Sequence, residues 1–249
     1  MGMIQIDNLH KSFDGLAVLD GVHLSVEKGT TAVILGRSGT GKSVLLKCIV
    51  GLLAPDSGNI RVDGEEVVGL ESNRLNALRK RMGFLFQGAA LYDSMSVRDN
   101  LAFPLRRNTT LTEEEIEQKV AGELEKVGLR EFVDKMPSQL SGGMRKRVGL
   151  ARTLITGPEF MFYDEPTTGL DPLTALEISS LILKLGRQHN VTSVAVTHDM
   201  ICARTIADKV AVLENGIIRY EGTIETMEQE NHAFVQSFFM SQRSIGHDQ

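Results

Sequence analysis

The clearest chemistry in the sequence lies in one glycine-rich segment, Gly36-Arg37-Ser38-Gly39-Thr40-Gly41-Lys42-Ser43. It matches the phosphate-binding pattern G-x-x-x-x-G-K-[ST] at every fixed position. Glycines allow the backbone to wrap closely round a polyphosphate and to point its N–H groups inward. Lys42 would place a positive charge on the terminal phosphates, and the Ser43 hydroxyl would be a ligand for Mg²⁺. The segment, with Val44 in the helix that follows, therefore predicts a site for a nucleoside triphosphate.

Polar residues stand directly after three further apolar segments: Gln87, the pair Asp164-Glu165, and His198. Because a sheet of parallel strands gathers its carboxyl ends on one edge, we expect these side chains to face the phosphate-binding segment. Asp164 would then hold Mg²⁺ opposite Ser43, and Glu165 would accept a proton from an attacking water. A lone histidine is more often structural, but the position of His198 on the same edge favours a function.

The elements that position these residues follow from the hydrophobic pattern. Buried strands are predicted at residues 31–35, 83–86, 160–163 and 194–197. Antiparallel strands are predicted at residues 4–9, 22–26, 59–62, 209–213 and 217–220, with turns at Asp14-Gly15, Asp63-Gly64 and Asn215-Gly216. Helices are predicted at residues 44–50, 74–80 and 172–185, and helical patterns dominate from 88 to 157, where Thr112 and Glu115 form a capping box.

The pattern predicts one α/β domain over residues 1–249, long enough to bury a substantial core. We expect an antiparallel β part at residues 1–30 and 55–70, and a nucleotide-binding core at 31–54, 71–87 and 158–232. An inserted helical part takes residues 88–157, and a C-terminal tail takes residues 233–249.

Two features leave alternatives open. Ser141, Gly142 and Gly143 precede a helix, so they can form a second anion site or an ordinary helix cap. Phe13 can stack on a nucleotide base or merely cover the sheet. The residue types alone decide neither question.

Composition narrows the function classes. The chain has 27 Lys and Arg against 32 Asp and Glu, a net charge of −5, which disfavours nucleic acid as a partner. Cys48 and Cys202 have no metal-site spacing and are interpreted as packing residues. No apolar run reaches the roughly eighteen residues of a membrane span, and no signal peptide is recognised, so we expect a soluble protein. Ile6 stands where a myristoylation motif after Met1-Gly2 needs Ser or Thr, and Met3 is a candidate natural start.

Taken in order, these motifs resemble those of the nucleotide-binding subunits of ABC transporters, over nearly the whole chain. The resemblance implies a P-loop NTPase (RecA-like) core with an antiparallel β subdomain and an inserted α-helical subdomain, which binds ATP and Mg²⁺ and hydrolyses ATP. It also implies a head-to-tail homodimer, in which each ATP lies between one subunit's phosphate-binding segment and residues 141–143 of the other.

The resemblance implies a role for each matching residue. Phe13 would stack on adenine, and Gln87 would contact both Mg²⁺ and the attacking water. Asp171 would cross the dimer interface, and His198 would hold the γ-phosphate. Met144 departs from the usual Gln of the signature, which leaves the contacts of Ser141 and Gly143 intact and puts only contacts beyond them in doubt.

The segment after Gln87, residues 88–97 with Asn100 and Pro104-Leu105, is similar to the Mla/Mce-type ATPases that power phospholipid traffic between bacterial membranes. This similarity implies a role in outer-membrane lipid asymmetry and a peripheral position on the cytoplasmic face of the inner membrane. The implied partners are an integral-membrane permease, Mce-type substrate-binding subunits and small STAS-type accessory subunits.

Other functions remain possible for such an ATPase. It can serve an importer of methionine or another polar solute instead. A soluble ABC ATPase of DNA repair or translation is disfavoured, because the sequence shows neither a long coiled coil between the nucleotide-binding halves nor a second such domain.

A docking surface for the membrane partner is expected just after Gln87, around Leu91, Tyr92, Met95 and Val97. For Leu91 and Val97 the alternative is equally open that they cover the helical part's own helices.

Overall fold

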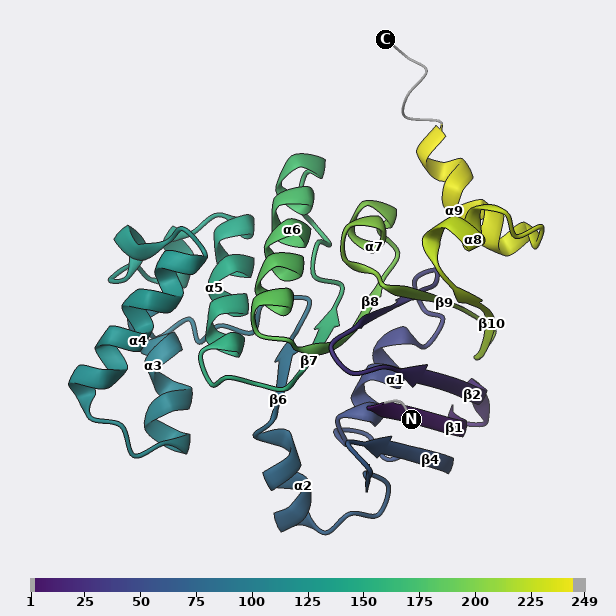
Figure 1. Ribbon diagram of the computed structural model, residues 1–249, viewed down its shortest axis with the longest axis horizontal. Coiled ribbons are helices and arrows are strands. Elements are labelled where there is room, and N and C mark those ends of the chain that lie inside the picture. Colours follow the sequence, from purple (N-terminus) through teal and green to yellow (C-terminus); the bar gives the residue numbers. More distant parts are fainter. Residues whose placement is uncertain (1–2, 244–249) are drawn as a thin grey trace.

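The structure, a computed structural model, describes residues 3–243, and Figure 1 shows two sheets with helices around them. This architecture confirms the predicted α/β fold. The interpretation of Met1-Gly2, and residues 244–249 of the predicted tail, lie outside the described residues.

The larger sheet carries the glycine-rich segment. In spatial order its strands are β10 (Ile217–Gly222), β9 (Lys209–Glu214), β3 (Thr31–Leu35), β8 (Thr192–Thr197), β7 (Phe160–Asp164) and β6 (Met82–Leu85). All neighbouring pairs from β9 to β6 are parallel, and β10 is antiparallel to β9. The central strands β3, β7 and β8 are buried at every position except the first residue of β3, which is half-buried, because both of their faces are covered.

The smaller sheet is antiparallel. Its strands, in spatial order, are β2 (Leu16–Val26), β1 (Ile4–Phe13), β4 (Ser57–Val62) and β5 (Glu65–Glu66).

The predicted turns Asp14-Gly15, Asp63-Gly64 and Asn215-Gly216 each place two consecutive residues at positive φ, between 48° and 81°. A tight hairpin turn needs this conformation, which explains the Asp-Gly and Asn-Gly pairs.

Helices cover both faces of the larger sheet (Figure 1). On one face lie α5 (Gly142–Leu154), α6 (Pro172–Gln188) and α7 (Met200–Ile206), and on the other lies α1 (Lys42–Ile49) with the smaller sheet. The remaining helices are α2 (Ser72–Arg79), α3 (Val97–Asn108), α4 (Glu113–Lys126), the 3₁₀ helices Arg130–Phe132 and Pro137–Gln139, α8 (Ile224–Glu228) and α9 (Ala233–Arg243). The capping box at the start of α4 has both of its hydrogen bonds.

Strand β3 separates two hydrophobic cores. Val33 and Leu35 face the core shared with α5, α6, α7 and the helical part, whereas Ala32 and Ile34 face the core shared with α1 and the smaller sheet. The phosphate-binding segment therefore leaves a strand that is fixed on both sides.

Burial of the cysteines and of the C-terminal helix is as follows. Cys48 and Cys202 are both buried, as predicted, and burial raises the pKa of Cys48 to about 11. Within residues 3–243, no helix is long and apolar enough to cross a membrane. Part of the predicted tail forms α9, in which Val235 and Phe238 belong to the same hydrophobic core as residues of α7 and α8.

Candidate functional site

Four predicted elements of the site meet at one edge of the larger sheet. The glycine-rich segment follows β3, Gln87 follows β6, Glu165 follows β7 and His198 follows β8. Because β3, β8, β7 and β6 are parallel neighbours, their carboxyl ends lie on the same edge. The sheet thus brings together residues that the chain separates widely.

The glycine-rich segment has the backbone of a phosphate cradle. Gly41 precedes α1 with φ +96° and supplies no side chain to cap the helix, so the first N–H groups of α1 stay available for an anion. A Cβ on Gly41 would lie 2.8 Å from Val18 Cγ1 and 2.9 Å from the Val18 carbonyl oxygen. Gly39 also has positive φ, and the outer residues Arg37, Ser38 and Gly39 are exposed, as a binding loop requires.

The Lys42 ammonium lies inside this loop, and the residue is 5% exposed. It donates to the carbonyl oxygens of Gly36 at 2.8 Å and Arg37 at 3.0 Å. Its Nζ is also 3.3 Å from Glu165 Oε1, so the loop and the predicted base form one charged cluster.

Two side chains whose oxygens can bind a metal, those of Ser43 and Asp164, lie in contact with each other. Ser43 Oγ donates to Asp164 Oδ1 at 2.7 Å, although the two residues are 121 positions apart. A hydroxyl and a carboxylate fit Mg²⁺, which prefers oxygen ligands and usually takes others from phosphate and water. No cluster of three or more His, Cys, Asp or Glu that could hold a metal occurs in the part of the chain that is described.

Glu165 is held through both its backbone and its side chain. Its φ is +49°, in the left-handed region, and its N–H donates to the Val196 carbonyl at 2.9 Å. Its Oε2 lies 2.9 Å from His198 Nδ1 and accepts a hydrogen bond from Thr168 Oγ1 at 2.9 Å. Burial acts to raise the pKa of Glu165, but the hydrogen bond and charge of His198, with the charge of Lys42, outweigh it and lower the pKa. The carboxylate is therefore ionised at neutral pH.

Sequence reasoning missed Lys146, which lies at the same edge. Lys146 is 5% exposed, and its ammonium donates to the carbonyl oxygens of Gln87 and Glu165, the latter at 3.2 Å. Burial lowers the pKa of Lys146 to about 8. A signal was available, since Lys146 falls between Gly143 and Leu150 on the buried face of α5.

Phe13 ends β1 and is 43% exposed, with Lys11 Nζ 5.4 Å from the ring centroid. A cavity of about 540 Å³ opens beside the phosphate-binding segment. It is lined by Leu16, Ala17, Val18, Arg37, Ser38, Gly39, Thr40, Glu214, Asn215, Gly216 and Phe234. Phe13 pairs with Leu16 at the end of the β1–β2 hairpin, but its ring does not line the cavity.

Two predicted groups do not join the phosphate-binding segment of the same chain. Ser141 caps α5, with its Oγ accepting from the Met144 N–H at 3.2 Å, and Asp171 caps α6 by accepting from the Thr174 N–H at 3.0 Å. That hydrogen bond from Thr174 lowers the pKa of Asp171. A Cβ on Gly143 would lie 2.6 Å from Thr174 Cγ2, so the two helix starts are packed together. Within residues 3–243, no hydrogen bond or ion pair links either cap to residues 36–43.

The predicted docking residues behave differently from one another. Val97 is 0% exposed in the core of the helical part, so its predicted contact with a partner is wrong. Leu91 is half-buried against the same core. Tyr92 is 41% exposed, packs its ring against Phe103 and lies beneath the Arg152 guanidinium.

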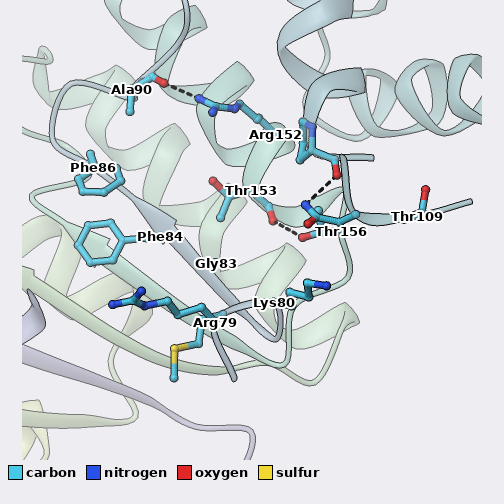
Figure 2. A pocket seen from close by; sticks show the side chains of 14 residues that line it. Arg79, Lys80, Gly83, Phe84, Phe86, Ala90, Thr109, Arg152, Thr153 and Thr156 are labelled. Carbon is cyan, nitrogen blue, oxygen red and sulfur yellow. Dashed lines mark hydrogen bonds between the residues drawn. The ribbon is translucent and has the colours of Figure 1, made fainter. Parts of the chain in front are cut away.

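A second cavity, of about 350 Å³, lies between the larger sheet and the helical part, and Figure 2 shows it from close by. Phe84 and Phe86 line one side, and Arg152, Thr153 and Thr156 of the α5 region line another. Phe86 immediately precedes Gln87, so this cavity borders the candidate site.

A family model described as ABC transporter matches residues 19–168. A solved structure, described as a dimeric post-hydrolysis state of the ATP-binding cassette MJ0796 bound to ADP and Pi, superposes with a TM-score of 0.82. It is 30% identical and covers 89% of this chain and 99% of that chain.

Curated relatives match almost the whole chain. The intermembrane phospholipid transport system ATP-binding protein MlaF of Haemophilus influenzae is 41% identical over 236 residues, 95% of this chain and 89% of that protein. The probable ribonucleotide transport ATP-binding protein mkl of Mycobacterium leprae is 39% identical over 240 residues, 96% of this chain and 69% of that protein. The methionine import ATP-binding protein MetN 1 of Pseudomonas syringae pv. syringae is 38% identical over 248 residues, 98% of this chain and 74% of that protein.

Proposed function

Because this chain belongs to the ABC transporter family and is an ATP-hydrolysing subunit of that family, we propose that it powers phospholipid transport between bacterial membranes. One observation carries the proposal: the phospholipid-transport relative is matched over 95% of this chain and 89% of its own length. The methionine-import relative is matched over 74% of its length. In this proposal the chain serves the lipid asymmetry of the outer membrane.

Import of methionine or another polar solute is the second candidate. The identity to the methionine-import relative, 38%, is close to the 41% found for the phospholipid-transport relative. The ATPase site does not touch the cargo, so the site serves either function equally well.

Transfer of lipid between vesicles separates the two candidates. The chain is copurified with its membrane partners, reconstituted into vesicles, and assayed for ATP-dependent movement of a fluorescent phospholipid to acceptor vesicles. A complex carrying Lys42→Ala is the control for passive exchange. Transfer above that control supports the proposal, whereas ATP-dependent uptake of labelled methionine without lipid transfer contradicts it.

For catalysis, we propose that Glu165 is the general base and that Lys42 and His198 bind the terminal phosphate. A base that takes a proton from the attacking water raises the rate of hydrolysis about 10²–10⁴-fold. In its imidazolium form His198 donates from both ring nitrogens, so it can bind Glu165 and a phosphate oxygen together. The ion pair between Lys42 and Glu165 supports this assignment, since it places a phosphate-binding ammonium next to the base.

We propose that ATP occupies the loop from Gly36 to Val44 with its base near Phe13, and that Ser43, Asp164 and Gln87 hold Mg²⁺. The ion would neutralise charge on the terminal phosphates when bound. The N–H groups at the start of α1 and the Lys42 ammonium bind the same phosphates from the protein side.

The exposed caps of α5 and α6 support a composite site made by two copies of the chain. We propose that residues 141–143 and Asp171 of one copy face the phosphate-binding segment of the other. Within residues 3–243, no hydrogen bond or ion pair joins either group to that segment, and the similar MJ0796 structures are dimers.

The cavity beside Phe86 supports a docking site for an integral-membrane permease. It is bounded by Phe84, Phe86 and Arg152 and lies next to Gln87 (Figure 2). A partner helix placed there would therefore be moved directly by structural changes at the site. Through that permease, the chain would lie at the cytoplasmic face of the inner membrane. Mce-type substrate-binding and small STAS-type accessory subunits are the further partners that we propose.

A further inference from the structure

Lys146 is a buried cation whose position the family motifs do not explain. Burying an ammonium is costly unless hydrogen bonds replace its hydration. The two acceptors of Lys146 are the main-chain carbonyl oxygens of Gln87 and Glu165. Within residues 3–243, no carboxylate oxygen lies within 4.0 Å of its Nζ, so its contacts are to backbone alone.

The helix that carries Lys146 holds the whole segment around Gln87. Gly149 packs against Ala89 so closely that a Cβ there would lie 3.0 Å from Ala89 Cβ and 3.1 Å from the Ala89 carbonyl oxygen. Arg152 donates to the Ala90 carbonyl, as Figure 2 shows. Residues three apart on α5 therefore hold consecutive parts of residues 87–90.

The segment needs this support because its backbone is unfavourable. Ala89 and Ala90 both have positive φ, 61° and 48°, which is sterically costly for alanine. Glu165 is also left-handed, at φ 49°. Its N–H is fixed by Val196, and its carbonyl oxygen is fixed by Lys146.

We propose that Lys146 is a positioning residue for ATP hydrolysis, because one ammonium ties the backbone of Gln87, after β6, to that of Glu165, after β7. The inference rests on the roles proposed for Gln87 and Glu165. Among the described residues, no hydrogen bond or ion pair joins Lys146 to the glycine-rich segment, so it controls the geometry of the reacting groups and not the affinity for ATP.

Two substitutions of Lys146 in the full chain test this role. Lys146→Met keeps the apolar stem and removes the hydrogen-bond donor. We expect kcat to fall about 10- to 100-fold, because small misplacements of reacting groups cost rates of this order. KM for ATP, and the dissociation constant measured with a fluorescent ATP analogue, should stay near the wild-type values. Lys146→Arg keeps a charged donor and should restore part of kcat.

Arg147→Met is the matched control, since it removes a basic residue of the same helix. Arg147 bonds the Val127 carbonyl and Glu177, away from the catalytic edge, so its loss can lower the melting temperature without lowering kcat. A folded Lys146→Met variant with kcat within about threefold of wild type would overturn the proposal. So would an equal loss of kcat in Arg147→Met.

Two further variants keep the test decisive. Where Lys146→Met does not fold, Lys146→Gln replaces it, because its amide is too short to reach both carbonyl oxygens, and unchanged kcat again overturns the proposal. Glu165→Gln is measured in parallel. If Glu165→Gln retains turnover, the role proposed for Glu165 is refuted. If Glu165→Gln loses turnover while Lys146→Met keeps a normal kcat, only the role inferred for Lys146 is refuted.

Discussion

At the scale of single residues, the candidate site is held together by contacts to Glu165. Its carboxylate is hydrogen-bonded to His198 and Thr168 and forms an ion pair with Lys42. Its backbone N–H and its carbonyl oxygen are each held by a hydrogen bond. This number of contacts stabilises a left-handed residue that would otherwise be strained. The same contacts keep the carboxylate ionised and fix its direction.

Glu165→Gln is therefore expected to keep ATP binding and to lower turnover by about 10²–10⁴, because the amide cannot accept the proton. Nucleotide should then hold the two copies together, which size-exclusion chromatography with ATP and Mg²⁺ will show as a dimer. Steady-state turnover within about threefold of wild type would rule out Glu165 as the base.

At the scale of elements, α5 does more than cover the sheet. Its start presents residues 141–143, its middle contacts the segment after Gln87, and its end lines the cavity of Figure 2. Gly149 is required for this close approach. A Cβ on Gly122 in α4 would instead meet no atom of residues 3–243 within 4 Å, apart from the backbone of its own helix and its chain neighbours.

These two helix-interior glycines give a paired prediction. Gly122→Ala should raise the free energy of unfolding by about 0.5–1 kcal/mol, since alanine loses less backbone entropy. Gly149→Ala gains the same helix propensity but pushes Ala89 and Leu85 away, so its stability should fall below that of Gly122→Ala and its kcat should drop. Chemical denaturation and steady-state assays measure both. Equal stability and equal kcat in the two variants would show that the contact of α5 with residue 89 is unimportant.

At the scale of the whole molecule, the proposed function needs surfaces beyond one chain. The exposed start of α5 and the cavity beside Phe86 lie on opposite ends of the same helix. One is proposed for a second copy of the chain and the other for a membrane partner, so α5 would link nucleotide and permease.

A mixing experiment tests the composite site. Ser141→Arg should block turnover without changing ATP affinity of its own chain, and Lys42→Ala should block turnover by losing phosphate binding. A mixed dimer has one interface that pairs an intact Lys42 with an intact Ser141, so we expect part of the activity to return. Verified mixed dimers that hydrolyse no faster than either parent would contradict the composite site.

Docking is tested by filling the cavity with charge. Thr156→Arg places a long cationic side chain at its wall, so the membrane partner should no longer copurify while the melting temperature and ATP binding stay normal. Ser180→Arg, an exposed position on α6, is the control. An intact complex with Thr156→Arg would place the partner elsewhere.

The sequence by itself determined the fold class and the residues at the sheet edge. Each of these features depends on a few adjacent residues: the glycine-rich segment, the tight turns, and the strand ends at Gln87, Asp164-Glu165 and His198. Local backbone sterics and burial on two faces leave such patterns few alternatives.

Only the tertiary structure decided which side chains share a core and which reach the site. Val97 is covered by the helical part's own packing, and Lys146 meets Gln87, 59 residues away, through a backbone carbonyl. A carbonyl oxygen is present at every position, so no residue type marks it as an acceptor. Whether a lysine is buried against it depends on how α5 packs between the sheet and the helical part, and that packing is a property of the whole molecule.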